Sequence, residues 1–435
     1  MLQPESSNPK LKSLEDWLVH LERVHPRSIE MGLERVGRVR AAMRLDPAFP
    51  VIAVGGTNGK GSVCAMLEAI LSEAGYRAGC YTSPHLLRYN ERVRVARRDA
   101  ADAELCRAFE EVEGARGDVS LTYFEFGTLA AVRLFADAAV DVAILEVGLG
   151  GRLDAVNAFD NDCAVVTCVD IDHVDYLGNT REAIGFEKAG IFRAGRAAVC
   201  ADPDPPQSVS RRADEVGARL LQLGRDFGCA GDRLQWNYWG AGGRRGSLPL
   251  PALRGAFQLR NAAAALAVLD EFRERLPVTM RDVRQGLLGV ELAGRFQVLP
   301  GRPTVVLDVA HNPHAARGLA GNLAALGRSR RSLAVFAMLR DKDIAGVVRA
   351  LKDGFDAWLV ADIAHPRGAS AADIAAVLRA EGVAGEVIEF ESPSQAYARA
   401  CEIAGQDDKI CVFGSFFTVA DVLGRLAAAR RNGRP

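Results

Sequence analysis

The stretch that decides the fold is VIAVGGTNGKGS, residues 51–62. Its first five residues form a short apolar run that ends in glycine, and apolar residues then recur with helical spacing from Lys60 to Ala74. This pattern predicts a buried β-strand followed at once by a helix that packs through one face.

The glycine-rich segment between them, residues 55–62, predicts a phosphate-binding loop. Glycines let backbone N–H groups converge on an anion, and the helix N-terminus adds partial positive charge. Lys60 can reach a terminal phosphate, and the Ser62 hydroxyl can assist a metal or a phosphate oxygen. The match to G-x-x-x-x-G-K-[ST] is imperfect, because Val54 and Gly61 replace the first glycine and the hydroxyl residue. A glycine-rich turn with an incidental lysine is the alternative, which the position of Lys60 and Ser62 at the helix start disfavours.

Outward from this loop, further apolar runs lie at residues 142–147 and 163–169, with helical patterns at 123–137 and 180–193. Strands without polar alternation, separated by helices, indicate a parallel sheet covered on both faces. The Pro-, Gly- and Arg-rich segment 201–253 predicts short strands at one edge, and an Ala-rich helix follows at 259–273.

A second series of strands and helices begins at Thr304. Strands are expected at residues 304–310, 333–339, 358–363, 386–390 and 409–414, and helices at 313–326, 344–351, 371–380, 393–403 and 416–428. Such a series is enough for a doubly wound domain of about 130 residues. The break is expected near residues 295–303, where LPGRP separates the two regions. We therefore predict an α/β protein with a P-loop-type, mostly parallel sheet domain at 1–297 and a smaller Rossmann-like α/β domain at 298–435.

Composition excludes several classes of protein. The chain has 435 residues, 49% hydrophobic and 25% charged, which excludes disorder, collagen and coiled coil as its main architecture. Its 54 Lys and Arg against 55 Asp and Glu argue against a dedicated nucleic-acid binder. The start lacks the apolar core of a signal peptide, and the nine scattered cysteines suggest neither a disulfide framework nor a zinc site. We expect a cytoplasmic protein with no membrane or nucleic-acid partner.

Three residues with metal-binding side chains lie where strands of the first sheet should end: Ser83, Glu146 and His173. Ligand sites in open α/β sheets form at the carboxyl ends of strands, so these three can converge with Lys60. A hydroxyl, a carboxylate and an imidazole suit Mg²⁺ held partly by nucleotide phosphates. Taken singly, Ser83 could cap a turn and Glu146 could be a buried acid bonded to backbone. Lys188 lies on a predicted helix beside Glu187. Its simplest interpretation is structural, a lysine that buries its aliphatic stem and keeps its ammonium in water.

Together with the loop GGTNGKGS, the segments TSPHLLRYNERV, EVGLGGRLDAVN, DHVDYLG, FEKAGIF, AGRFQV, DVAHNPHAA and MLRDKD occur in order along the chain. This set resembles the bacterial bifunctional dihydrofolate synthase/folylpolyglutamate synthases of the Mur ligase superfamily, over essentially the whole chain. The resemblance implies an ATP-dependent, ADP-forming ligase. A substrate carboxylate would attack the γ-phosphate of ATP, and the amine of L-glutamate would displace phosphate from the acyl phosphate. The acceptors would be dihydropteroate and the glutamate tail of reduced folates.

The resemblance also implies roles for single residues. Lys60, His173 and Lys188 would be catalytic. Mg²⁺, at two sites, would be held by Ser83, Glu146, His173 and Lys188, the last carbamylated by CO₂ so that it becomes an anionic ligand. ATP would be bound by Thr57, Asn58, Gly59, Lys60, Gly61, Ser62, Asn261, Arg295, Asp308 and His311.

The folate and glutamate sites follow in the same way. Dihydropteroate would contact Ile29, Glu30, Met31, Gly32, Thr122, Tyr123, Phe124, Glu125, Leu153, Asp154 and Ala155, and glutamate would contact His311 and Ser415. Thr122 and Glu125 also have the spacing of a helix capping box. The chain departs from the family pattern at Val156, at Phe417 and in the spacing before Asn261. A monomer acting on small molecules is the family expectation.

Two other functions are weighed against this one. A Mur ligase acting on a UDP-sugar peptide is disfavoured because about 50 residues precede the loop, too few for a UDP-binding domain. A P-loop nucleotide switch without ligase chemistry is disfavoured by the second α/β domain, which carries DVAHNPHAA at a strand end.

Overall fold

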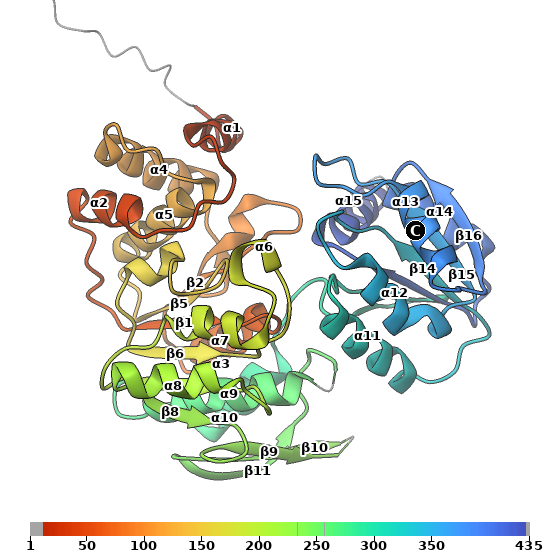
Figure 1. Cartoon of the computed structure of the whole chain (residues 1–435). Coiled ribbons are helices and arrows are strands. Elements are labelled where there is room, and N and C mark those ends of the chain that lie inside the picture. Colours follow the sequence, from red (N-terminus) through yellow and green to blue (C-terminus); the bar gives the residue numbers. More distant parts are fainter. Residues whose placement is uncertain (1–11, 233, 256, 432–435) are drawn as a thin grey trace, which may run out of the picture.

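The computed structural model describes residues 12–232, 234–255 and 257–431 (Figure 1). Much of the start interpreted above as lacking a signal peptide, residues 1–11, lies outside the described residues. The chain forms two α/β bodies, each around a mostly parallel sheet, and a small antiparallel sheet joins the first body. The predicted α/β fold class is confirmed. Among the described helices, none has the length and apolarity to cross a membrane.

The larger body is built on an eight-stranded sheet in which six strands are parallel and an antiparallel hairpin occupies one edge. In spatial order the strands are β4 (Arg98–Asp99), β3 (Val93–Val95), β2 (Ala78–Tyr81), β5 (Val142–Glu146), β1 (Val51–Gly55), β6 (Cys163–Val166), β7 (Ala197–Cys200) and β8 (Arg219–Gln222). All five residues of β1 are buried. Its alternate side chains enter two different cores, Val51 and Ala53 one and Ile52 and Val54 the other, which explains the absence of polar alternation.

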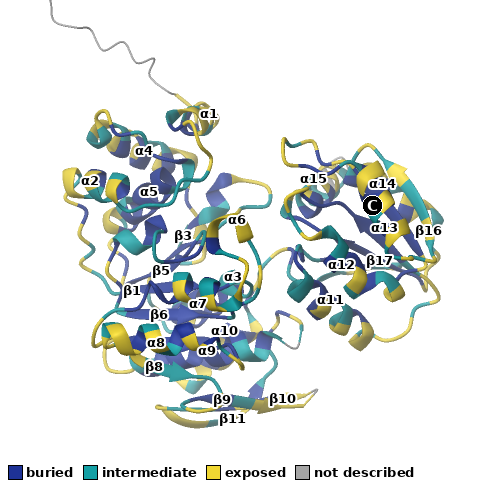
Figure 2. Ribbon diagram, viewed as in Figure 1, coloured by how far each residue is buried: buried dark blue, intermediate teal, exposed yellow. Residues whose placement is uncertain are grey.

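Helices cover both faces of this sheet, so its central strands, β1, β2, β5, β6 and β7, are fully buried (dark blue in Figure 2). One core involves α1 (Leu14–Val24), α2 (Glu34–Ala42), α4 (Asp102–Arg116), α5 (Tyr123–Asp137), α7 (Arg181–Ala189) and α8 (Gln207–Val216), and the other α3 (Lys60–Glu73), α9 (Phe257–Glu271) and α10 (Met280–Leu288). The connections contain η1 (Tyr89–Arg92), η2 (Ala155–Ala158) and α6 (Val174–Leu177). The small sheet, β9 (Gly228–Gly231), β10 (Gln235–Gly240) and β11 (Gly243–Pro249), packs against α9 in the second core.

The C-terminal body has a six-stranded sheet, parallel except for its first strand. Its spatial order is β12 (Gln297–Leu299), β13 (Thr304–Leu307), β17 (Lys409–Phe413), β14 (Ser332–Phe336), β15 (Ala357–Ala361) and β16 (Glu386–Phe390). One core involves α11 (Pro313–Ala325), α12 (Ile344–Leu351) and α13 (Ala371–Ala380), and the other α14 (Pro393–Ile403) and α15 (Phe416–Arg431). The short helix η3 (Lys352–Gly354) directly follows α12. The strand and helix series expected after Thr304 is confirmed.

Two local predictions differ from the structure. Segment 201–253 contains helix α8 and the parallel edge strand β8 as well as the small sheet. Helix α8 was missed because its buried face is narrow, with Val209 and Ala213 as its apolar members. The expected break near residues 295–303 contains strand β12, which pairs antiparallel with β13, so the predicted boundary at 297/298 falls on its first residues.

Candidate active site

The phosphate loop lies between β1 and α3, as the sequence predicts. Gly59 precedes the helix with φ +89°, a conformation that favours glycine, and a Cβ there would stand 2.7 Å from the Asn261 side-chain oxygen. The Lys60 ammonium donates to the carbonyls of Gly56 at 3.1 Å and Thr57 at 3.4 Å. The Lys60 side chain is therefore folded back onto its own loop.

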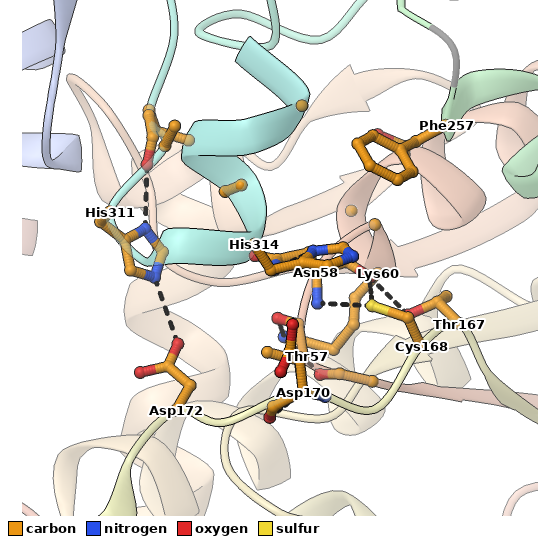
Figure 3. Close-up of a pocket in the computed structure, with 18 of the residues that line it drawn as sticks. Thr57, Asn58, Lys60, Thr167, Cys168, Asp170, Asp172, Phe257, His311 and His314 are labelled. Carbon is orange, nitrogen blue, oxygen red and sulfur yellow. Dashed lines mark hydrogen bonds and ion pairs between the residues drawn. The ribbon is translucent and has the colours of Figure 1, made fainter. Parts of the chain in front are cut away.

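A cavity of about 730 Å³ opens from this loop and is lined by both bodies. Lining residues come from the phosphate loop, from the ends of β5 and β6, from the start of α9 and from the ends of β13 and β17. Because carboxyl ends of parallel strands from two sheets meet here, the cavity is the candidate active site. Figure 3 shows Asn58 and Lys60 below His314 and Phe257.

The four residues named as metal ligands all line this cavity. The backbone N–H of Ser83 donates to Glu146 Oε2 at 3.0 Å, which brings the ends of β2 and β5 together. Burial raises the pKa of Glu146, and the positive charge of Lys60 opposes that shift. His173 has φ +52° and stands directly before α6.

The side chains of Ser83, Glu146 and His173 suit a hard cation whose coordination is completed by further oxygen ligands. Among the described residues, no three His, Cys, Asp or Glu side chains gather as a metal-binding group. A carboxylate, a hydroxyl and an imidazole would need further oxygen ligands, and Mg²⁺ in proteins commonly takes those from phosphates and water. Lys188 is 4% exposed, and burial, together with the charge of Lys60, lowers its pKa to about 7. An amine with this pKa is partly neutral near pH 7, the form that can react with CO₂.

The residues expected to bind ATP line the same cavity. The Asn261 amide donates to Gln258 at 2.9 Å beside Gly59. Arg295 is half-buried, with its guanidinium 4.9 Å from the centre of the Phe416 ring, and its Nη2 lies 3.9 Å from where a Cβ on Gly61 would stand. Arg295 thus reaches from the connection between the two bodies to the phosphate loop.

The carboxylate of Asp308, by contrast, is occupied by backbone groups. It accepts from the N–H groups of Phe296 and Ala310, both at 2.8 Å. Burial raises its pKa, and the charge of Arg295 opposes that shift. Asp308 lines the cavity while fixing the loop that carries Arg295 and Phe296.

A polar network that the sequence did not predict crosses the cavity between the two bodies. Lys342, before α12, donates to Asp172 Oδ1 at 2.6 Å and to His173 Nε2 at 3.2 Å. Asn312 donates to Asp172 Oδ2 at 3.0 Å, and His311 Nε2 lies 3.6 Å from the same oxygen. Burial alone would raise the pKa of Asp172, but the contact with His311 and the charge of Lys342 hold it well below its usual range.

The sequence carried some signal for this network. Asp172 begins the segment DHVDYLG, and Lys342 lies within MLRDKD. Nothing in their spacing along the chain predicted that the two side chains would bind each other. Asn58 bonds to Asn312 and His314, and the Phe257 and His314 rings lie 5.1 Å apart (Figure 3).

The three segments named for dihydropteroate come together beside the cavity. The N–H of Gly32 donates to Leu153 O at 3.2 Å. The Phe124 ring lies 2.7 Å from where a Cβ on Gly148 would stand, and the Met31 methyl 3.4 Å from that of Gly150. The glycine run after β5 therefore leaves room for Phe124 and Met31 to approach from two other segments.

The polar members of these segments bond to protein groups. Asp154 accepts from Leu149 N at 2.8 Å and Val156 N at 3.0 Å, and burial raises its pKa to about 7. Thr122 and Glu125 form the capping box of α5. Leu153 and Ala155 flank Asp154, and Ile29 and Tyr123 are half-buried in the other two segments.

His311 and Ser415, the two residues expected to contact glutamate, both line the cavity. Ser415 is buried, and its hydroxyl contacts Thr418 Oγ1 at 2.7 Å at the start of α15. His311 contacts Val309 O at 2.9 Å through its other ring nitrogen. Both lie at the carboxyl ends of C-terminal strands, across the cavity from the phosphate loop.

Family models match both bodies. The Mur ligase middle domain matches residues 54–269, and the Mur ligase glutamate ligase domain matches residues 294–416.

Relatives of known family match nearly the whole chain. The dihydrofolate synthase/folylpolyglutamate synthase of Escherichia coli (strain K12) is 45% identical over 432 residues, 99% of each chain. That of Haemophilus influenzae is 40% identical over 441 residues, 95% of this chain and 98% of its own.

Solved structures agree. The E. coli protein FolC in complex with DHPP and ADP has a TM-score of 0.92 at 44% identity, covering 97% of this chain and 99% of its own. The bifunctional enzyme of Yersinia pestis has a TM-score of 0.88 at 45% identity, covering 96% and 99%. A bifunctional enzyme with Mn, AMPPNP and L-glutamate bound has the same values. This chain therefore belongs to the dihydrofolate synthase/folylpolyglutamate synthase family of the Mur ligase superfamily.

Proposed function

We propose that this protein is an ATP-dependent ligase that adds L-glutamate to dihydropteroate, forming dihydrofolate, and to the glutamate tail of reduced folates. The observation that carries this proposal is the shared cavity. It is lined by the phosphate loop, by C-terminal strand ends and by Gly148 and Gly150, the glycines that Phe124 and Met31 approach. The relatives of this chain are dihydrofolate synthase/folylpolyglutamate synthases. Solved relatives are bound to ADP and DHPP, or to Mn, AMPPNP and L-glutamate.

The chemistry follows from the arrangement of charges. The acceptor carboxylate attacks the γ-phosphorus of ATP, ADP leaves, and the glutamate amine then displaces phosphate from the acyl phosphate. Lys60 would turn from its carbonyl partners to the phosphates, and the loop N–H groups would hold their oxygens. Thr57, Asn58, Gly59, Gly61, Ser62, Asn261, Arg295, Asp308 and His311 complete the proposed ATP site.

Ser83, Glu146, His173 and carbamylated Lys188 would hold Mg²⁺ at two sites. Bound there, Mg²⁺ would neutralise the charge that develops between phosphate and carboxylate. The burial of Lys188 supports the carbamate, because a buried ammonium next to Lys60 is disfavoured while an anion there would be attracted to it. His311 and Ser415 would receive glutamate.

We propose further that the chain divides into domains near 297/298, that it acts as a monomer in the cytoplasm, and that its partners are the small-molecule substrates. The network between Asp172 and Lys342 supports closure of the two bodies around ATP, which would exclude water from the acyl phosphate.

A product assay tests the function. The protein is incubated with ATP, Mg²⁺ and labelled L-glutamate, with either dihydropteroate or tetrahydrofolate as acceptor. Label is expected in dihydrofolate and in polyglutamylated folate. Incorporation with tetrahydrofolate alone would reduce the enzyme to a folylpolyglutamate synthase, and incorporation with neither acceptor would contradict the proposal.

A further inference from the structure

One arginine outside the cavity connects two of the three folate segments. Arg35, in the first turn of α2, donates through Nη1 to Glu30 Oε1 at 2.5 Å and through Nη2 to Glu30 O at 2.9 Å. The same guanidinium meets Glu125 at the start of α5, with Nε 3.3 Å from Oε2 and Nη2 3.1 Å from Oε1. A single guanidinium thus joins Glu30 to Glu125, which lies 90 positions after Arg35 in the sequence.

The two carboxylates are already engaged by protein groups. Glu30 Oε2 lies 3.2 Å from His25 Nε2, and His25 Nδ1 lies 3.0 Å from the Ser120 hydroxyl. Glu125 Oε2 accepts from the Thr122 N–H at 2.8 Å. Neither glutamate belongs to the described residues that line the main cavity.

The neighbours of these glutamates in sequence are the apolar side chains that approach the glycine run. Met31 follows Glu30 and lies beside Gly150, while Phe124 precedes Glu125 and lies beside Gly148. Arg35 therefore holds, through two carboxylates, the segments that carry Met31 and Phe124. Its side chain is 21% exposed and that of Glu125 is 4% exposed, so solvent screens this bridge less than a surface ion pair.

We propose that Arg35 is a positioning residue of the folate site, setting the separation of Met31 and Phe124 and thereby the width of the slot that accepts a flat pterin ring. Glu30 and Glu125 then act through Arg35 and not through contact with the ligand. This inference rests on the proposed function, since the ligand class of the slot comes from it.

The test compares Arg35→Met and Arg35→Lys with the parent. Loss of a charge-assisted fork should raise KM for dihydropteroate about tenfold or more in Arg35→Met. KM for ATP should stay within about twofold and kcat at saturation within about threefold, since the phosphate loop is untouched. Arg35→Lys should lie between, because one ammonium can keep Glu30 or Glu125 but cannot reproduce the fork.

Arg38→Met is the matched control. Arg38 lies on the same helix, is 61% exposed and stands 4.0 Å from Asp118, so all its kinetic constants should match those of the parent. If KM for dihydropteroate in Arg35→Met stays within about twofold of the parent, or rises in step with KM for ATP, the positioning role is refuted. Should Arg35→Met fail to fold, Arg35→Lys and Glu125→Gln decide on the same criteria. A parent protein that makes no dihydrofolate would instead contradict the proposed function, before any variant is assayed.

Discussion

The contact between Lys342 and Asp172 offers a direct measure of what holds the two bodies together. Lys342→Met removes the ammonium and keeps most of the aliphatic stem. Lys342 Nζ lies 2.6 Å from Asp172 Oδ1, and the two side chains are 8% and 9% exposed, respectively. Asp172 would keep Asn312 and His311 as partners. We expect the variant to favour separation of the bodies.

The magnitude follows from where the lost bond lies. A hydrogen bond between charged groups contributes about 1.5–3 kcal/mol. Removing one partner of a pair buried within a domain costs about 3–5 kcal/mol, because the other charge stays buried. Here Asp172 can reach water when the two bodies separate, so we expect the loss of Lys342 to cost about 1.5–3 kcal/mol. At about 1.4 kcal/mol per tenfold, the closure equilibrium shifts about 10- to 150-fold towards the open form.

Small-angle X-ray scattering and KM for ATP measure this shift. The radius of gyration of Lys342→Met should exceed that of the parent, and KM for ATP should rise, because the proposed site needs groups from both bodies. Arg317→Met is the control, since the Arg317–Asp170 pair also joins the two bodies but is 61% and 24% exposed. An exposed pair contributes about 0–1 kcal/mol, so its effect should be about fivefold or less. Equal effects of the two variants, or no expansion in Lys342→Met, would refute the reasoning.

Three further outcomes are expected. Lys60→Ala should lower kcat/KM about 100-fold or more in the product assay by removing a preorganised phosphate ligand, and an unchanged value would contradict that role. Gly148→Ala places a methyl 2.7 Å from the Phe124 ring and should raise KM for dihydropteroate with KM for ATP unchanged, whereas equal rises would point to general damage. The third outcome concerns Lys188 in CO₂-free buffer. Between about pH 7 and the usual pKa of lysine, its side chain is protonated in the unfolded chain but neutral in the folded protein. The contribution of Lys188 to the free energy of unfolding should therefore rise with pH in this window, by up to about 1.4 kcal/mol per pH unit. The difference in unfolding free energy between the parent and Lys188→Met, measured in denaturant at pH 6.5 and 9, should change accordingly, and a constant difference would exclude the shifted pKa.

Local sequence patterns predicted most of the elements because each depends on nearby residues. The apolar run before Gly55 and the spacing after Lys60 fixed a strand, a loop and a helix, and helix α5 and strand β16 have the predicted bounds. Strand β12 was missed because three half-buried residues beside a proline-rich turn carry no periodic signal. Helix α8 was missed because only two apolar residues, Val209 and Ala213, lie on its buried face.

The α/β class, the phosphate loop and the set of polar residues that follow strands could all be predicted from local patterns in the chain. These properties depend on hydrophobic periodicity and on the rule that parallel strands end at one edge. The tertiary structure alone decided which of those ends face one another. The pairing of Asp172 with Lys342, 170 residues apart, and the bridge from Arg35 to Glu125 depend on how two sheets and their crossovers pack. Such contacts bring together charges whose separation along the chain carries no information about their distance in space.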